Sequence, residues 1–221
     1  MVFETGCPAG LFLHPLRKVD RMDIEQVCRS GERALAKADP VMGRLIKRHG
    51  PCPIHDTSGT MFHHLASAII AQQLSVKAAA TIQERVMKLT AKPMSPAKFL
   101  LVEVDGLRAA GLSKQKVSYI RNLAEAMEQG LSKGRLQRMS DDEAMSALTA
   151  VKGIGQWTAE MYLMFGLRRL DVVSLGDAGL QRAARMLYNG GEAEPGLLAR
   201  VSENWKPYRS IACWYLWQSL D

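Results

Sequence analysis

Residues 151–159 read Val-Lys-Gly-Ile-Gly-Gln-Trp-Thr-Ala, and this stretch decides the fold because it places two glycines between two helical patterns. Upstream, Ser140 and Glu143 have the spacing of a capping box, so a short helix is expected to lead into the stretch. Downstream, four apolar residues recur at helical spacing: Trp157, Met161, Met164 and Leu167. The sequence therefore predicts a helix, a glycine turn and a second helix.

The glycine turn has a chemistry of its own. Gly153 and Gly155 leave the backbone free of side chains, so its N–H groups can point at an anion beside the positive end of the following helix. A turn of this kind can grip one phosphate of a nucleic-acid strand. A glycine pair between helices is by itself most often only a turn, so this interpretation depends on the rest of the pattern.

Further along, Val172-Val173-Ser174-Leu175-Gly176 leads to Asp177. Together with the glycine turn, this pattern resembles the helix-hairpin-helix DNA glycosylase superfamily, and within it the short form of the 3-methyladenine DNA glycosylase II type. The resemblance runs from about Phe62 to Trp217. It implies a mainly α helix-hairpin-helix glycosylase fold with two helical lobes flanking an active-site cleft. Residues 61–166 would form the lobe with the hairpin, and residues 1–60 with 167–221 the terminal lobe with the Asp loop.

Composition and charge agree with a nucleic-acid partner without requiring one. The chain has 221 residues, of which 47% are apolar, enough for a sizeable core. Its net charge of +7 favours a polyanion, because clustered Lys and Arg displace counterions from phosphates. Charge alone does not separate DNA from RNA or from a membrane surface.

The cysteines indicate a reducing compartment. Cys7, Cys28, Cys52 and Cys213 form no Cys-x-x-Cys pair, so neither a zinc site nor a disulfide framework is suggested. The iron–sulfur branch of the superfamily is disfavoured, because only Cys213 follows Asp177. The apolar run 10–13 is too short for a signal peptide. We expect a bacterial cytoplasmic, nucleoid-associated protein.

Asp177 is the candidate catalytic residue. A lone Asp before a helix is normally an N-cap that stabilises by about 1 kcal/mol. The resemblance adds a second role, because Asp177 matches the superfamily's catalytic position. Excision of a base develops oxocarbenium character on the sugar, which a carboxylate stabilises while it positions or deprotonates the attacking water. Asp171 is the competing acid, and we assign it to structure.

The resemblance also assigns a base-binding pocket. Trp217 in the final helix matches a pocket tryptophan, Trp157 is a second wall, and Met161 lies near the cleft; aromatic faces would stack on a cationic alkylated purine. The alternative for each of these three residues is plain core packing. For the nearby aromatic residues Trp214 and Tyr215, core packing is the interpretation that we prefer. Members that also cut the DNA backbone carry a Lys where this chain has Trp157. A monofunctional enzyme is therefore expected.

Two other segments are assigned to DNA by the resemblance. Gln73 would fill the hole left by a flipped nucleotide, although adjacent glutamines at a helix junction are most often solvated. Ser113 would touch the strand opposite the lesion, and Lys114 and Lys116 would meet phosphates. The alternative, a helix cap at Ser113 with a solvated basic first turn, has equal weight.

No organic cofactor or catalytic metal is implied. By resemblance, the carbonyls of Thr149, Val151 and Ile154 would hold a Na⁺ or K⁺ at the hairpin. The expected function is monofunctional hydrolysis of the N-glycosidic bond of alkylated purines, of the 3-methyladenine and 7-methylguanine type, in double-stranded DNA by a monomer. The alternatives are a non-excising binder of damaged DNA and a structural helical adaptor.

Overall fold

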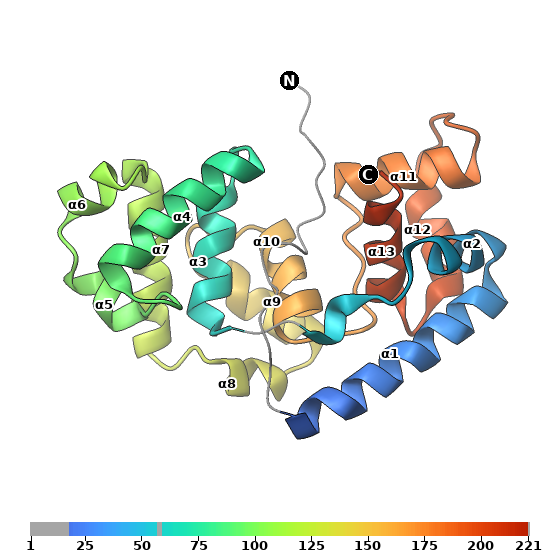
Figure 1. Ribbon diagram of the computed structural model, residues 1–221, viewed down its shortest axis with the longest axis horizontal. Coiled ribbons are helices and arrows are strands. Elements are labelled where there is room, and N and C mark those ends of the chain that lie inside the picture. The colour runs from blue at the N-terminus through green and yellow to red at the C-terminus, as the bar shows by residue number, and fades with distance from the viewer. Residues whose placement is uncertain (1–17, 57–58, 221) are drawn as a thin grey trace. The chain divides into compact units, whose positions relative to one another are not determined.

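The computed structural model describes residues 18–56 and 59–220, and throughout these ranges the regular structure is helical, with no strand (Figure 1). The prediction of a mainly α fold is confirmed. The described chain divides into two compact units. Unit 1 is Met1–Ser58 with Arg168–Asp221, and unit 2 is Gly59–Leu167. Cys7 and the apolar run 10–13 lie outside the described residues.

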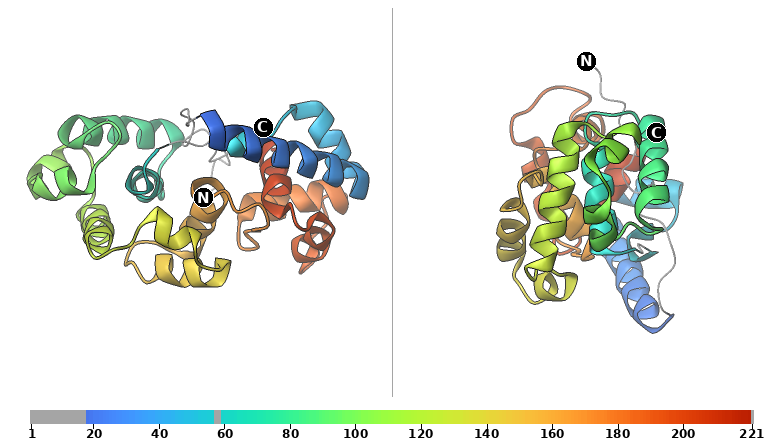
Figure 2. Two further views of the ribbon diagram at one scale, coloured as in Figure 1. Left: turned by 90° about the horizontal axis from the view of Figure 1, so that it is seen from below. Right: turned by 90° about the vertical axis from the view of Figure 1, so that its left-hand side faces the viewer.

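Unit 1 is organised around its last helix, α13, which contacts α1, α2 and α11 (Figures 1 and 2). Every residue of α13 from Ser210 to Trp217 is buried, including Trp214 and Tyr215, as predicted for these two aromatics. The helices of unit 1 are α1 (Lys18–Ala38), α2 (Pro40–His49), the short η2 (Pro53–Asp56), α11 (Ala178–Tyr188), α12 (Leu197–Ser202), the short η4 (Glu203–Trp205) and α13 (Arg209–Gln218).

Asp39 fixes the start of α2 and joins it to the rest of unit 1. Its Oδ1 accepts from the Val41 N–H at 2.8 Å, and Pro40 occupies the first helical turn, where its missing N–H costs nothing. Its Oδ2 accepts from the Tyr188 hydroxyl at 2.7 Å and the Trp205 indole at 2.9 Å. This buried carboxylate therefore has a partner on both oxygens, as burial of a charge requires.

Three cysteines lie in the described part of the chain. Cys28, Cys52 and Cys213 are buried thiols, and no disulfide joins any of the three. Burial raises the pKa of the Cys28 thiol to about 11, with a further contribution from the nearby Glu32 carboxylate. A thiol in this state is not a nucleophile at neutral pH.

Unit 2 is organised around α3, whose residues Met61, Phe62 and Leu65 to Ile70 are buried apart from Ala68. It contacts α4, α7, α10 and η3. The helices of unit 2 are α3 (Met61–Ala71), α4 (Val76–Thr90), α5 (Pro96–Leu101), α6 (Val104–Ala109), α7 (Lys114–Glu128), α8 (Lys133–Gln137), α9 (Asp141–Thr149), α10 (Gln156–Met161) and the π-helical η3 (Tyr162–Gly166).

The helix after the glycine turn differs from its prediction. The α-helical pattern ends at Met161 and continues as a π-helix to Gly166, so the spacing from Trp157 to Leu167 is not that of one α-helix. Gly166 permits this turn, because a Cβ there would overlap the Tyr162 ring. Trp157, expected on the apolar face, is 40% exposed.

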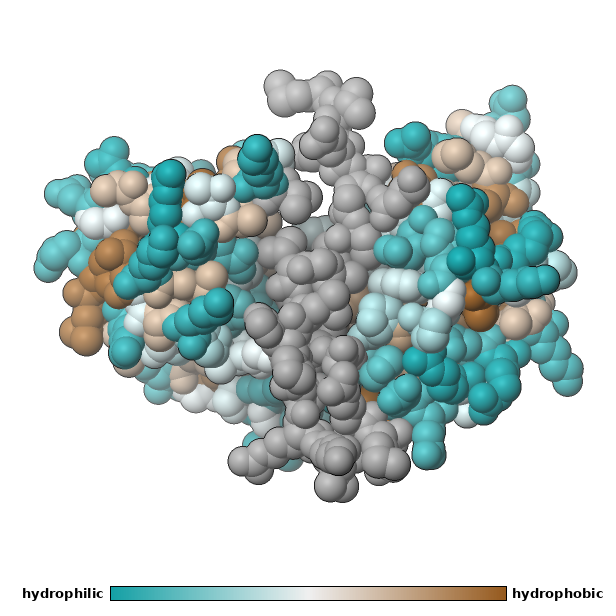
Figure 3. Space-filling view, in the orientation of Figure 1, coloured by the Kyte–Doolittle hydropathy of each residue, from teal (hydrophilic) through white to brown (hydrophobic). Residues whose placement is uncertain are grey.

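The face shown in Figure 3 is mostly hydrophilic. A brown patch lies over the connection between α5 and α6, where Leu101 is 83% exposed and Val104 is 37% exposed. Within residues 18–56 and 59–220, none of the helices has the length and apolar character needed to cross a membrane.

Candidate active site and nucleic-acid interface

The first helix of the hairpin, α9, begins as the sequence predicts. The Ser140 N–H donates to Glu143 Oε2 at 2.8 Å, and the Glu143 N–H donates to Ser140 Oγ at 3.2 Å. The predicted capping box is therefore confirmed. The backbone hydrogen bond from Ser140 lowers the pKa of the Glu143 carboxyl.

The glycine turn is held by one backbone bond and two buried side chains. The Ile154 N–H donates to the Val151 carbonyl at 3.0 Å, and the side chains of both residues are buried. Gly153 has a φ of 107°, and a Cβ at this position would overlap the Tyr119 side chain. Only glycine combines this backbone conformation with so close an approach.

The second helix of the hairpin, α10, begins without a side-chain cap. Its N-cap residue is Gly155, which is exposed and extended, and the next two residues, Gln156 and Trp157, are also exposed. The first N–H groups of a helix have no intrahelical partner, and they carry the positive end of the helix dipole. The hairpin thus presents backbone donors at its surface, an arrangement suited to a phosphate.

The turn between α3 and α4 carries Gln73 in an unusual conformation. Gln73 is exposed and has a φ of 59°, in the left-handed region, which costs about 1–3 kcal/mol for a residue other than glycine. The preceding Gln72 donates from its side-chain amide to the Gly153 carbonyl at 3.3 Å. The strained turn is therefore tied to the hairpin within unit 2.

The structure corrects the interpretation of Lys116. Its ammonium donates to the Ile70 carbonyl at 2.6 Å and to the Gln72 carbonyl at 2.7 Å, so it binds the end of α3 instead of pointing outward at phosphates. Burial lowers its pKa. Sequence reasoning missed this role because a lysine in a first helical turn is usually solvated.

Ser113 caps α7, as its local sequence predicts. Its Oγ accepts from the Lys116 N–H at 3.2 Å, and both Ser113 and Lys114 are exposed. Because both residues are exposed, the Ser113 hydroxyl and the Lys114 ammonium are accessible to a DNA strand. Their contacts with DNA stay predictions.

The carbonyls predicted to hold Na⁺ or K⁺ lie in and beside the hairpin turn. The Thr149 hydroxyl donates to the Met145 carbonyl at 2.9 Å, so this side chain is engaged within α9. The Val151 carbonyl accepts the Ile154 N–H, and a carbonyl oxygen has a second lone pair. Neutral carbonyl oxygens are the ligands that K⁺ takes in proteins, so the donor chemistry fits.

In unit 1, the loop before Asp177 is anchored by the start of α13. Arg209 binds Asp171 through Nε to Oδ1 at 2.7 Å and through Nη2 to Oδ2 at 3.0 Å. The Val172 N–H donates to Ser210 Oγ at 3.0 Å, and Ser210 is fully buried. The structural role predicted for Asp171 is confirmed, and the hydrogen bond that Arg209 donates to Asp171 raises the pKa of Arg209.

Asp177 is the N-cap of α11, as its local sequence predicts, and its catalytic role stays a prediction. Its Oδ1 accepts from the Leu180 N–H at 2.7 Å, which is an N-cap bond to α11, and from the Trp217 indole N–H at 3.1 Å. The carboxylate is thus held in one orientation by a backbone donor and a side-chain donor from two helices.

Trp217 therefore does more than the sequence indicated. It was assigned to the base-binding pocket, and it is 4% exposed with its N–H bound to Asp177. The sequence gives no signal for this bond, because the residues are 40 positions apart. Its role as a pocket wall stays a prediction.

Gly179 is a site residue that sequence reasoning missed. A Cβ there would lie 3.1 Å from Asp177 Oδ1 and 3.4 Å from Trp217 Cδ1, tighter than ordinary contact. Glycine lowers helix propensity by about 1 kcal/mol, so its place in the first turn of α11 calls for a packing reason. The signal available in the sequence was the Gly itself, two residues after the candidate Asp.

The other predicted pocket residues belong to unit 2. Trp157 is 40% exposed at the start of α10, whereas Met161 is 1% exposed and packs as a core methionine. For Met161 the structure shows the packing that was its alternative interpretation. A role in a pocket stays a prediction for both residues.

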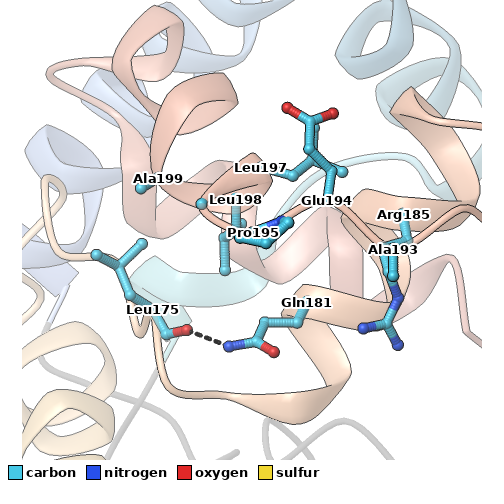
Figure 4. Close-up of a pocket in the computed structure, with 10 residues that line it drawn as sticks. Leu175, Gln181, Arg185, Ala193, Glu194, Pro195, Leu197, Leu198 and Ala199 are labelled. Carbon is cyan, nitrogen blue, oxygen red and sulfur yellow. Dashed lines mark hydrogen bonds between the residues drawn. The ribbon is translucent and has the colours of Figure 1, made fainter.

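A separate pocket of about 500 Å³ lies in unit 1 (Figure 4). It is bordered by Leu175, by Gln181 and Arg185 of α11, and by residues 193–199. The Gln181 side-chain amide donates to the Leu175 carbonyl at 2.8 Å, which supports the loop before Asp177. None of the residues predicted for the site lines this pocket.

A helical unit whose hairpin presents backbone N–H groups, and a second unit whose Asp177 carboxylate caps a helix, agree with the class of helix-hairpin-helix DNA repair proteins. The chain belongs to the HhH-GPD superfamily of base excision DNA repair proteins, whose pattern it matches over residues 66–207.

Curated relatives carry glycosylase names. The chain is 33% identical over 163 residues to DNA-3-methyladenine glycosylase 1 of Schizosaccharomyces pombe, covering 72% of each chain. It is 31% identical over 194 residues to an alkylbase DNA glycosidase-like protein of the same organism, covering 85% of this chain and 91% of the relative.

Two solved structures of glycosylases are similar to this chain. A DNA-3-methyladenine glycosidase from Bacillus halodurans superposes with a TM-score of 0.76 at 42% identity, over 85% of this chain and 87% of the other. The 3-methyladenine DNA glycosylase of Schizosaccharomyces pombe, solved in complex with abasic DNA, gives a TM-score of 0.74 at 29% identity, over 86% and 96%.

Proposed function

We propose that this protein is a monofunctional DNA glycosylase that removes alkylated purines of the 3-methyladenine and 7-methylguanine type from double-stranded DNA. One observation supports the proposal: the Leu180 N–H and the Trp217 indole hold the carboxylate of Asp177, the residue that the sequence resemblance assigns to catalysis. The names of the relatives supply the substrate class.

The proposed reaction needs only a carboxylate and a water molecule, because the alkylated purine is already a good leaving group. The bond between C1′ and the purine nitrogen breaks, and the bonding electrons leave with the base. Alkylation at N3 or N7 gives the purine a positive charge, so it departs as a neutral molecule. Asp177 stabilises the oxocarbenium character of the sugar and takes a proton from the water that adds to C1′. The products are the free base and an abasic site.

The backbone donors of the hairpin would hold the DNA. Gly153 and Gly155 keep side chains away from the strand, and the uncapped start of α10 favours a phosphate. A Na⁺ or K⁺ on the Thr149, Val151 and Ile154 carbonyls would add a cation at this point. Gln73 would occupy the space left by the flipped nucleotide and so lower the cost of extruding it.

The monofunctional part of the proposal depends on residue 157. A glycosylase that also cuts the backbone needs an amine that forms a Schiff base with the sugar. Trp157 has no amine, so strand cleavage by that route is unavailable at this position. Trapping of a protein–DNA adduct with borohydride would contradict this part.

A direct assay tests the proposed function. A duplex carrying one 7-methylguanine is incubated with an excess of the protein, and the released base is measured by chromatography. The product strand is examined with and without alkali. Release of the base, with strand breaks only after alkali, is the expected result. No release from several alkylated purines, despite binding to the duplex, would overturn it.

The second candidate, a non-excising binder of damaged DNA, is favoured by one observation. A relative that covers 85% of this chain carries the name glycosidase-like instead of glycosidase. Such a binder would keep its affinity for damaged DNA when Asp177 is replaced by Asn, and it would release no base in either form. The same chromatographic assay therefore separates the two candidates.

A further inference from the structure

Unit 2 contains three segments that the sequence analysis assigned to DNA: the α3–α4 turn with Gln73, the start of α7 with Ser113, and the hairpin around Gly153. We propose that Lys116 is a positioning residue that fixes the backbone of Gln73 for entry into the duplex, and that Gln72 holds this turn in register with the hairpin. The proposal rests on the proposed function, because it requires Gln73 to enter DNA.

Lys116 closes the end of α3. The last carbonyls of a helix have no intrahelical partner, and the C-terminal end carries the negative end of the helix dipole. The Lys116 ammonium donates to the Ile70 carbonyl at 2.6 Å and to the Gln72 carbonyl at 2.7 Å. A charged donor from α7 therefore satisfies two carbonyls where α3 ends.

This contact acts directly on the backbone of Gln73. The Gln72 carbonyl belongs to the peptide unit that joins residues 72 and 73, so holding that oxygen restrains the rotation that sets φ of Gln73. That φ is 59°, in the left-handed region. A residue other than glycine keeps such a conformation only when its surroundings over-determine it. Lys116 supplies the restraint from outside the turn.

The same turn is joined to the hairpin. The Gln72 side-chain amide donates to the Gly153 carbonyl at 3.3 Å, and the Asn122 side-chain amide donates to the Lys152 carbonyl at 3.3 Å. Tyr119 packs against Gly153. Residues 116, 119 and 122 are spaced to lie along one side of α7, so this helix supports both the turn and the hairpin.

Two lysines in the first turn of α7 offer a matched comparison. Lys116 is half-buried and its ammonium faces the carbonyls of α3, whereas Lys114 is exposed. Loss of an outward lysine that meets a phosphate weakens binding and lowers its salt dependence. Loss of an inward positioning lysine should instead change how the bound DNA is distorted.

The test measures insertion separately from affinity. A duplex carries a tetrahydrofuran abasic analogue with 2-aminopurine beside it, and the fluorescence rise on unstacking is recorded at saturating full-length protein. We expect a rise for the wild type, a rise about tenfold smaller for Lys116→Met, which loses hydrogen bonds from a charged group, and recovery of most of the signal in Lys116→Arg. Lys114→Met should bind more weakly but keep the full signal at saturation.

A full fluorescence rise in Lys116→Met at saturation would overturn the positioning role. If that variant does not fold, Gln72→Met decides, because it removes only the side-chain bond to Gly153: a reduced rise supports the proposal and an unchanged rise overturns it. The Gln73→Ala variant distinguishes failure of this proposal from failure of the proposed function. If it keeps the full rise, Gln73 does not enter the duplex and this proposal fails, while base release by the wild type still tests the proposed function on its own.

Discussion

Two helix starts in this molecule use the same physical feature in opposite ways. At α10, Gly155 supplies no side-chain cap, and the first residues are exposed. At α11, the Asp177 carboxylate occupies the equivalent place and accepts from the Leu180 N–H at 2.7 Å. Both helix ends attract negative charge. One is open to a phosphate from outside, and the other already holds a carboxylate of the chain itself.

The difference separates binding from chemistry. The hairpin carries no acidic side chain from Val151 to Gly155, and its one titratable residue there is the exposed cation Lys152, so it contributes backbone dipoles and a positive charge that can hold any phosphate regardless of sequence. The Asp177 site contributes one charge with a fixed direction, set by Leu180 and Trp217. Changes at the first place should therefore affect affinity, and changes at the second should affect rate.

The largest expected effect is at Asp177. Asparagine caps helices about as well as aspartate, so Asp177→Asn should keep α11 while removing the charge. We expect the single-turnover rate of base release to fall by about a hundredfold or more. The affinity for a duplex with an abasic analogue, measured by fluorescence anisotropy, should stay within about twofold of the wild type. A variant that binds poorly would contradict the separation.

The next largest effect is at the hairpin. Gly153→Ala places a Cβ against Tyr119 and strains a φ of 107°. We expect DNA affinity to weaken by about tenfold or more, since such strain costs about 1–3 kcal/mol. Gly155→Ala adds a Cβ that meets nothing within 4 Å at an ordinary φ, so it measures only the cost of a side chain beside the strand, and a smaller loss is expected. Equal losses in the two variants would show that strain at Gly153 is not the cause.

A smaller effect is expected at Trp217. Trp217→Phe keeps an aromatic ring but removes the N–H that lies 3.1 Å from Asp177 Oδ1. The rate of base release should fall by about three- to tenfold, the worth of one hydrogen bond. Trp214→Phe, which changes a buried indole outside the Asp177 contacts, is the matched control for packing. If both variants lose the same rate, the indole does not orient the carboxylate.

The smallest functional effect is expected at Ser140. Ser140→Ala removes the capping box of α9, which should lower the free energy of unfolding by about 1 kcal/mol. Base release and DNA affinity at low temperature should not change, because the turn itself is held by Val151, Gly153 and Ile154. Denaturant titration measures the first quantity. A loss of DNA affinity would show that the start of α9 sets the turn.

Local signals in the sequence predicted the helices well. Ser113 and Ser140 each cap the start of a helix in the structure, because capping residues act within one turn. The π-helical turn at Tyr162–Gly166 was not predicted, since it depends on the packing of Tyr162 against Gly166. Helical spacing alone does not reveal that contact.

The sequence predicted which residues belong to the candidate site better than it predicted the hydrogen bonds between them. Asp177 and the two hairpin glycines follow from motifs. The bonds from Trp217 to Asp177 and from Lys116 to Gln72 join residues 40 and 44 positions apart, and no local pattern encodes them. The phosphate contact predicted for Lys116 was wrong for this reason: the residues before it, Ser113 to Gln115, are exposed, and its partners lie at the end of another helix.

The most direct test compares Asp177→Asn with Gly153→Ala in one experiment. Single-turnover base release from a 7-methylguanine duplex is followed over a range of protein concentrations, giving a maximal rate and the concentration for half saturation. The account predicts that Asp177→Asn loses the maximal rate with unchanged half saturation, and that Gly153→Ala keeps the maximal rate but needs more protein. Loss of the same quantity in both variants would contradict the separation of binding from chemistry.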